Sequence, residues 1–261
     1  MDPGLRTAAS GMQAQQQMID VIANNLANVN TTGFKRSRAS FEDLLYETVQ
    51  GARTEAPKQA ETLGPIQIGK GVRLSAVMRL HSQGSPSQTG RPLDLAIQGD
   101  GFFQVQRPDG TVGYTRDGTF TLSDTGSVVT ADGYPLTPPL AVPSDAQNLS
   151  ISTTGVVSTT TTGGKTTQIG RIELVRFINP SGLEALGQNV YAETSASGDP
   201  IRGAPGDPYF GTVLQGNLES SNVEIVQEMT DMIAAQRAYE INAKAVQTGE
   251  NMLDTTNALI R

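Results

Sequence analysis

The sequence predicts an α+β protein, with long N- and C-terminal helices that form a coiled-coil-like assembly domain around an all-β central body and extended linkers. Near both ends apolar side chains recur at steps of three and four residues, the spacing of a coiled-coil seam. The middle is rich in Gly, Thr and Ser and contains short alternating runs typical of strands. We expect a helical assembly domain at 1–33 and 221–261, linkers at 34–90 and 198–220, and a β-rich body at 91–197.

Composition excludes several classes of protein. The chain of 261 residues is long enough for a sizeable core, and its net charge of −7 argues against a nucleic-acid footprint. No stretch of eighteen apolar residues predicts a membrane span, and no Sec-type signal is visible. Cysteine is absent, which excludes disulfides and thiolate sites. Only 17% of the residues are charged, a low share that favours amide-rich contacts over a free charged surface.

The N-terminal helix is predicted to open at Asp2-Pro3, an acidic N-cap followed by proline, and to stop at Gly33. Its seam consists of Leu5, Ala8, Met12, Ile19, Ile22, Leu26 and Val29. Its polar face carries amides instead of Lys and Glu, notably at Asn24, Asn25 and Asn28. Amides donate and accept together, which suits contacts with neighbouring chains. An amphipathic helix packed only on its own domain is the alternative.

After this helix, residues 34–46 hold a short apolar cluster, and residues 47–63 turn polar without an apolar period, as an extended connection does. Alternation over 66–80 predicts a strand. In the body, Asp-Gly pairs seven or eight residues apart over 93–140 predict a meander of antiparallel strands. A further strand is expected over 169–178, and a return linker over 198–208.

The C-terminal helix is predicted to open at Ser221, since Glu224 completes a capping box, and to run about 36 residues. Its main seam is formed by Ile225, Met229, Met232, Tyr239, Ala243, Val246, Leu253 and Ile260. A second apolar row consists of Val226, Ile233, Ala234, Ile241 and Ala245. Two rows indicate contact with more than one neighbour, which favours an assembly.

No motif argues for catalysis, a metal site or a cofactor. Residues 64–71 nearly spell a phosphate-binding loop, but Gly71 stands where Ser or Thr is needed and no helix follows. His81 is the single histidine, and we expect it at a polar surface or an interface. The Asp-Gly pairs lack the ligand pattern of a calcium loop. Paired carboxylates for glycoside hydrolysis stay open, although no aromatic-rich groove is evident.

Three separated stretches carry a resemblance. Residues 23–35 (ANNLANVNTTGFK) resemble the N-terminal signature of the bacterial flagellar rod and hook protein family. Residues 221–223 and 232–240 (SNV and MIAAQRAYE) resemble its C-terminal signature, and the body stretches 96–103 and 114–118 are also similar. Together these motifs extend over nearly the whole chain.

Within the family, residues 41–46, 69–72 and 81–84 and the linker 46–63 look most like the distal-rod members. The resemblance implies a homopolymeric tubular drive shaft in the basal body, spanning the periplasm, which carries torque from motor to hook. It implies four partners: further copies of the chain, proximal rod and hook-family proteins at the rod's ends, bushing ring proteins around it, and the flagellar type III export apparatus. A proximal rod or hook protein of this family remains the alternative, and a secreted β-rich hydrolase or adhesin is an alternative from another class.

The candidate site is therefore an assembly interface and a linker that sets stiffness. The interface residues are Leu5, Met12, Ile19, Ile22, Asn24, Asn25, Leu26, Asn28, Val29, Gly33, Phe34, Ile225, Met229, Met232, Ile233, Gln236, Arg237, Tyr239, Val246 and Leu253. The linker residues are Tyr46, Gln50, Arg53, Pro57 and Leu63.

Overall fold

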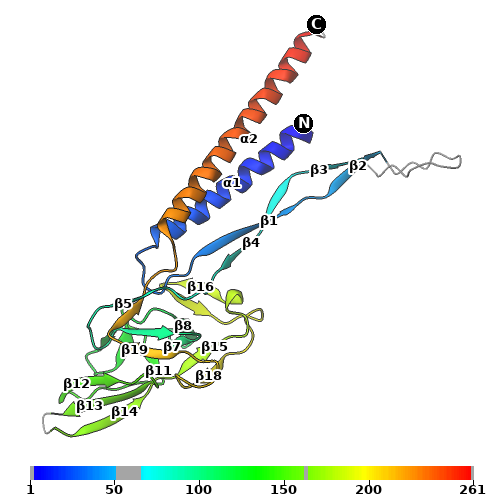
Figure 1. The fold of residues 1–261 in the computed structure, drawn as a ribbon. Helices are drawn as coiled ribbons and strands as arrows, with labels where there is room; N and C mark the ends of the chain where they lie inside the picture. Colours follow the sequence, from blue (N-terminus) through cyan, green and yellow to red (C-terminus); the bar gives the residue numbers. More distant parts are fainter. Residues whose placement is uncertain (1–2, 51–65, 162–163, 260–261) are drawn as a thin grey trace. The chain divides into compact units, whose positions relative to one another are not determined.

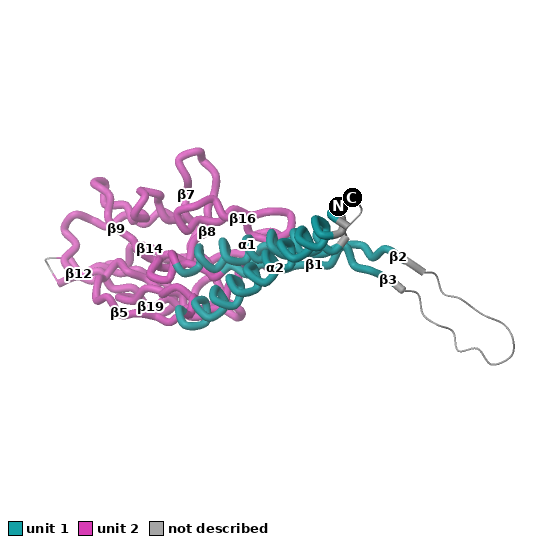
Figure 2. The backbone as a smooth tube through the Cα atoms, turned by 90° about the horizontal axis from the view of Figure 1, so that it is seen from above, with its two compact units in different colours: residues 1–26, 37–78, 225–261 teal, residues 27–36, 79–224 magenta. Residues whose placement is uncertain are grey.

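A computed structural model describes residues 3–50, 66–161 and 164–259. The chain divides into two compact units, coloured separately in Figure 2. Unit 1 contains residues 1–26, 37–78 and 225–261, and unit 2 contains residues 27–36 and 79–224. The α+β prediction is confirmed, because two long helices flank a middle built from strands. No helix among the described residues is long and apolar enough to cross a membrane.

The two helices of unit 1 are α1 (Pro3–Ala27) and α2 (Ile225–Leu259), and they run side by side in opposite directions (Figure 1). A Cβ built on Gly249 would lie 2.5 Å from Cδ2 of Leu5, and one on Gly11 would lie 3.0 Å from Nδ2 of Asn242. The numbers rise along α1 as they fall along α2, which defines an antiparallel pair.

The end of α1 and the beginning of α2 both differ from the prediction. Helix α1 ends at Ala27, because Asn28 closes a turn in which its C=O and Oδ1 accept from the N–H and hydroxyl of Thr31, each at 3.1 Å. Asn and Thr side chains compete with the helix for backbone partners in this way. Helix α2 begins at Ile225, and Ser221 forms no capping box: its Oγ accepts from the Val223 N–H at 3.3 Å.

Gly33 has a different structural role from the predicted helix stop. It has a φ of +68°, and its N–H donates to the Glu219 carbonyl at 2.8 Å. A Cβ at this position would lie 2.7 Å from the Asp117 nitrogen, so the close approach of two backbones requires glycine.

Unit 1 also contains two antiparallel two-stranded ribbons, which follow one another along the same stretch of chain. Strand β1 (Ser37–Asp43) pairs with β4 (Val72–Arg79), and β2 (Tyr46–Gln50) pairs with β3 (Ile66–Gly69). The predicted strand over 66–80 is thus two strands, broken at Gly71, whose φ is +112°.

Unit 2 contains the remaining strands and a 3-10 helix, η1 (Pro180–Gly182). Its largest sheet has seven strands in the order β16-β17-β8-β7-β15-β18, with β11 also on β7. These are β7 (Phe102–Gln106), β8 (Val112–Thr115), β11 (Leu136–Thr137), β15 (Leu174–Arg176), β16 (Glu184–Gly187), β17 (Val190–Ala192) and β18 (Ile201–Gly203). A three-stranded sheet holds β12 (Ala146–Ile151), β13 (Val156–Thr161) and β14 (Thr166–Arg171). Three pairs complete the unit: β5 (Pro86–Gln88) with β20 (Asn217–Glu219), β6 (Leu95–Gln98) with β19 (Thr212–Gln215), and β9 (Phe120–Leu122) with β10 (Val128–Thr130).

The predicted meander is only partly right. Asp109-Gly110 is the turn of the β7–β8 hairpin, and residues 123–127 join β9 to β10. However, β6 pairs with the distant β19, and the single strand expected over 169–178 is divided between β14 and β15. The stretch 198–208, expected as a linker, contributes β18 to the main sheet.

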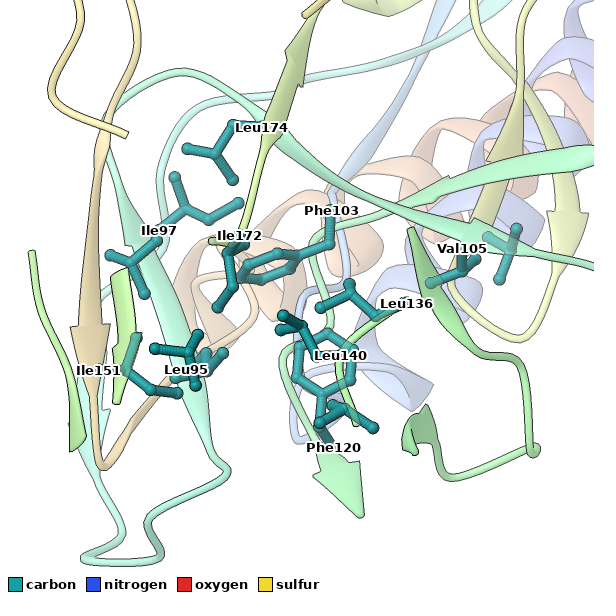
Figure 3. Close-up of a cluster of buried hydrophobic side chains, with 14 residues drawn as sticks. Leu95, Ile97, Phe103, Val105, Phe120, Leu136, Leu140, Ile151, Ile172 and Leu174 are labelled. Atoms are coloured by element: carbon teal, nitrogen blue, oxygen red, sulfur yellow. The ribbon is translucent and has the colours of Figure 1, made fainter. Parts of the chain in front are cut away.

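Two hydrophobic clusters fill unit 2. Strand β7 alternates between them, with Phe103 and Val105 in the larger cluster and Phe102 in the smaller one, as the period of two in a strand requires. Figure 3 shows Phe103 against Ile172 near the centre of the larger cluster. The smaller cluster consists of Phe102, Tyr114, Val175, Phe177, Leu183 and Tyr191.

Candidate assembly interface

The inner face of α2, which meets α1, consists of small and polar residues. Glu228, Ala235, Asn242 and Gly249 are spaced by seven residues, and the first two are 0% and 3% exposed. On α1, Ala14 and Ile22 are buried at 5% and 4%. Small side chains at these positions let the two helix axes approach closely, which is the reason that large substituents at Gly11 and Gly249 would clash.

The predicted α2 residues largely lie outside this inner face. Met232 and Val246 are half-buried, whereas the other predicted positions are exposed: Ile225, Met229, Ile233, Gln236, Arg237, Tyr239 and Leu253. We call the apolar side chains Val226, Met229, Ile233 and Ile241 the outer row; they are 73%, 51%, 50% and 67% exposed. Val226 and Ile233 each stand two residues before an inner position, about 200° round the helix at 3.6 residues per turn. Val226 and Ile233 therefore face away from α1, whereas Met229 and Ile241, each one residue from an inner position, lie about 100° round the helix, on its flanks.

The predicted residues of the N-terminal stretch are divided between the two units. In α1, Leu5, Met12, Ile19 and Leu26 are half-buried, Ile22 and Asn25 are buried, and Asn24 is exposed. In unit 2, Asn28, Val29 and Phe34 are half-buried and Gly33 is buried. The structure therefore gathers seven of these residues on one helix and places the other four in the β unit.

Asn25 is an internal fixing point of unit 1. Its Nδ2 donates to the Ser37 carbonyl at 2.8 Å and its Oδ1 accepts from the Ser37 N–H at 2.8 Å, so the side chain pairs with the start of β1 as a strand would. Nδ2 also donates to Oε2 of Glu228 at 3.1 Å. One amide thus joins α1, α2 and β1, which explains why a polar residue is 1% exposed here.

A buried ion cluster of Lys35, Arg116 and Glu219 lies in unit 2, with side chains 0%, 3% and 1% exposed. Nζ of Lys35 lies 2.6 Å from Oε1 of Glu219, and Nη1 of Arg116 lies 3.3 Å from Oε2. Oε1 also accepts from the Gly84 N–H at 2.9 Å, and Lys35 donates to the Ser82 carbonyl at 2.7 Å. Burial lowers the pKa of Lys35, and the facing Glu219 carboxylate opposes that effect.

Asn222 ties together the chain segments beside this cluster. Its Oδ1 accepts from the Arg36 N–H at 2.7 Å, while Nδ2 donates to the Leu80 carbonyl at 2.8 Å and to the Ser82 carbonyl at 3.1 Å. The Leu80 N–H in turn donates to the Arg36 carbonyl at 2.9 Å. The chain passes between the two units at four places, and three of them, at 36/37, 78/79 and 224/225, are therefore joined by hydrogen bonds within unit 2 close to the crossing.

These contacts give a structural role to the motifs that resemble the rod and hook family. The motifs containing Gly33 and Lys35, His81 to Gly84, Arg116, and Asn222 all converge on this one region of unit 2. Sequence reasoning missed Lys35, Arg116, Glu219 and Glu228 as a group. Their only signal was the charge itself. Their partners lie far away along the chain: Lys35 and Glu219 are 184 residues apart, and Glu228 and Asn25 are 203 residues apart.

His81 is packed among aromatic rings, which differs from the polar surface or interface expected for it. Its ring lies 5.5 Å from those of Phe102 and Tyr191 in edge-on contact. Nδ1 is buried without a hydrogen-bond partner among the described residues. Burial, together with the positive charges of Lys35, Arg116 and Arg79, lowers the pKa of His81 from 6.5 to about 4.

This depressed pKa makes unit 2 sensitive to acid. Because unfolded His81 binds a proton at a higher pH than folded His81, its contribution to stability is complete above pH 6.5 and is lost as pH falls toward 4. The loss amounts to about 3 kcal/mol at 1.36 kcal/mol per pKa unit. Unfolding by urea at pH 7 and pH 4 measures it, and His81→Phe is expected to flatten the difference. Equal pH dependence in both proteins would contradict this assignment.

The predicted linker lies mostly outside the described residues. Tyr46 opens β2 and is 56% exposed, and Gln50 ends that strand. Arg53, Pro57 and Leu63 fall in the stretch 51–65, which the structure does not describe.

Comparison with known proteins assigns these features to a family. Residues 5–35 match the flagella basal body rod protein family, residues 96–159 the flagellar hook protein FlgE/F/G D1 domain, and residues 214–259 the flagellar basal body rod FlgEFG protein C-terminal family. The matches include the Asn25 and Glu228 fixing points of the helix pair.

Full-length relatives give the same result. The chain is 48% identical over 262 residues to the flagellar basal-body rod protein FlgG of Borreliella burgdorferi, covering 98% of each chain. It is 46% identical over 257 residues to FlgG of Caulobacter vibrioides, again covering 98% of each. Identity to the flagellar hook-basal body complex protein FlhP of Bacillus subtilis is 30% over 267 residues, covering 97% of each chain. The chain belongs to the flagellar basal-body rod protein family.

Proposed function

We propose that this chain is a structural subunit of the flagellar distal rod, which assembles with further copies into a helical tube and transmits torque from motor to hook. The observation that carries the proposal is the outer row of α2. Its four large apolar side chains are at least half exposed, and none of them lies on the face that meets α1. Each contributes about 1.5–3 kcal/mol when a neighbour covers it. The 46–48% identity to proteins named FlgG favours the distal rod within the family.

The remaining roles follow from this place in the flagellum. We expect proximal rod and hook-family proteins at the two ends of the polymer, bushing ring proteins around it, and delivery through the type III export apparatus across the periplasm. The role is mechanical and not enzymatic. The hydrogen bonds of Asn222 and the buried ion cluster support it, because they hold three chain segments of unit 2 together at Arg36, Leu80 and Asn222.

The segment 47–63 is proposed to set the stiffness of the rod. Tyr46, directly before the segment, and Glu47 and Thr48 at its beginning are exposed, and a polar segment of this length can form additional contacts between subunits. Removing residues 51–62 is expected to make rods more flexible, which bending analysis of isolated rods in electron micrographs measures. Unaltered bending stiffness would remove this role.

The assembly role is tested by deleting either end of the chain. Removal of residues 1–33 or 225–261 is expected to abolish rod formation and swimming. Each deletion removes one helix of the pair and leaves the other helix without the partner on which it packs. The readout is the number of rods in basal bodies from cells that make this chain as their only distal rod protein. Rods built by a truncated chain would refute the proposal, and curved instead of straight tubes built by the full chain would favour a hook protein.

A further inference from the structure

A hollow of about 160 Å³ lies at the end of β15 in unit 2, and we call it the β15 hollow. Its lining includes Gly101, Phe102, Phe177 and Ile178, which are apolar, and the guanidinium-bearing Arg116 and Arg176. It is smaller than the roughly 300–1,000 Å³ of small-molecule sites and holds about five waters of ~30 Å³ each. That volume suits a single side chain from another protein.

The rim of this hollow is apolar and exposed. Ile178 is 78% exposed and Tyr209 is 79% exposed, with the Arg176 guanidinium 5.4 Å from the Tyr209 ring centroid. Ile201, which pairs with Arg176 across β15 and β18, is 40% exposed on the last strand of the seven-stranded sheet. Large apolar side chains gathered around one hollow are typical of a docking surface.

The hollow also has donors that no acceptor meets. The Nε groups of Arg116 and Arg176 are buried donors without a partner in the described part of the chain, and Arg116 is 3% exposed. The lining holds these two guanidinium groups and the carboxylate of Asp100, while a pKa near 4 keeps His81 neutral at pH 7. Arg116 already pairs with Glu219, so Arg176 is the guanidinium without an ion-pair partner among the described residues. An unmet buried donor is costly, so the chemistry of the hollow favours an incoming carboxylate.

Unit 1 of the same chain carries a segment with the matching chemistry. Leu45, between β1 and β2, is 85% exposed, and Tyr46 beside it is 56% exposed. Of the nearby carboxylates, Glu42 is paired with Arg73 and Glu47 with Lys70. Asp43 is exposed and has no cation partner in the described residues. An apolar side chain therefore stands two residues from a carboxylate that no cation balances.

The ribbon that presents this segment needs a partner. A two-stranded ribbon is marginally stable alone in water, and the described side chains of β2 are all exposed. Ile68 of β3 is 50% exposed as well. A surface that covers Leu45 and Tyr46 would remove apolar area from water and so stabilise the β2–β3 ribbon.

From these two surfaces we infer that Leu45 of one copy inserts into the β15 hollow of another copy, with Asp43 accepting hydrogen bonds from Arg176. The inference rests on the proposed function, since it specifies one contact of the homopolymer. Two different patches meet, so the contact is heterologous. Head-to-tail contacts of this kind close into rings or extend into open helical filaments, and only the second outcome builds a shaft.

Disulfide trapping tests the contact directly, because the chain has no cysteine. Leu45→Cys and Ile178→Cys are made as separate single variants and produced together in cells that lack their own distal rod protein. Basal bodies are then isolated under mild oxidation. A covalent dimer is expected in the mixture and in neither variant alone, since a disulfide needs Cα atoms about 4.4–6.8 Å apart. Leu122→Cys replaces Ile178→Cys in the control, because Leu122 is also exposed on unit 2, at 46%.

Charge reversal gives an independent measurement if the cysteine variants fail to build rods. Asp43→Arg adds a third cation at the hollow and is expected to reduce the number of rods per cell at least about tenfold. Arg176→Asp in the same chain is expected to restore them.

The outcomes separate the inference from the proposed function. Rods of the unchanged chain without a 45–178 dimer above the control, or charge reversals that do not compensate each other, overturn the inference and leave the assembly role intact. If the unchanged chain builds no rods, the proposed function itself fails. A cross-link within one chain carrying both cysteines, formed before assembly, also overturns the inference, because the segment would then cover its own hollow.

Discussion

Replacing Lys35 with methionine is expected to lower the free energy of unfolding of unit 2 by about 3–5 kcal/mol. Glu219 is 1% exposed and keeps only Arg116, at 3.3 Å, as a cationic partner when Lys35 is removed. The Ser82 carbonyl loses its 2.7 Å donor at the same time. Urea unfolding followed by the near-ultraviolet signal of Tyr114 and Tyr191 measures the change, because both rings are buried in this unit.

A second lysine provides the matched control. Lys70 lies 3.3 Å from Glu47, but the two side chains are 52% and 66% exposed. Lys70→Met is therefore expected to cost less than about 1 kcal/mol, as exposed ion pairs do. If Lys35→Met cost no more than Lys70→Met, the buried ion cluster would not be a source of stability. The double variant Lys35→Met/Glu219→Leu is expected to be less damaging than the sum of the single changes, since it leaves no uncompensated charge.

Replacing Ile233 with aspartate is expected to block rod assembly and to leave both units folded. Ile233 belongs to the outer row and is 50% exposed, so the chain tolerates a charge there before assembly. In a polymer the same position would lose about half of the ~1.5–3 kcal/mol that full burial of such a side chain contributes, and it would bury a carboxylate. We therefore expect at least a tenfold loss of rods, by roughly 1.4 kcal/mol per factor of ten.

Two measurements decide this prediction. Circular dichroism of the purified chain is expected to show unchanged helix content, and counting rods in isolated basal bodies is expected to show their loss. Leu122→Asp makes the same chemical change at a side chain of similar exposure in unit 2, 46% against 50%, and is expected to preserve rods. Normal rod numbers with Ile233→Asp would show that the outer row meets no neighbour.

Apolar periodicity predicted where the two helices lie in the chain but not which face of α2 contacts α1. Steps of three and four located both helices, and α2 begins within four residues of the predicted position. On α2 the same pattern did not identify the inner face, since large apolar side chains were taken as the seam. The seam instead uses Glu228, Ala235, Asn242 and Gly249. Residues that permit close approach or hydrogen bonding carry no hydrophobic signal, so only the facing helix reveals them.

Strand pairing was predictable only where it is local. The Asp109-Gly110 pair correctly indicated the hairpin of β7 and β8, because a three-residue loop that ends on a glycine with positive φ, here +80° at Gly110, is a common hairpin connection. The pairing of β6 with β19 joins positions more than a hundred residues apart, and no local propensity encodes it. For the same reason the role of residues 198–208 in the main sheet was invisible.

The sequence by itself determined the fold class, the family and the two helical ends, because these depend on local periodicity and on motifs that are read in order. The tertiary structure alone decided that Asn25 fastens three elements of unit 1, that Lys35, Arg116 and Glu219 form a buried ion cluster, and that Arg176 borders a hollow with unmet donors. Each of these depends on burial and on distances between residues far apart in the chain. Those quantities set the energies of polar groups, and they exist only after the chain has folded.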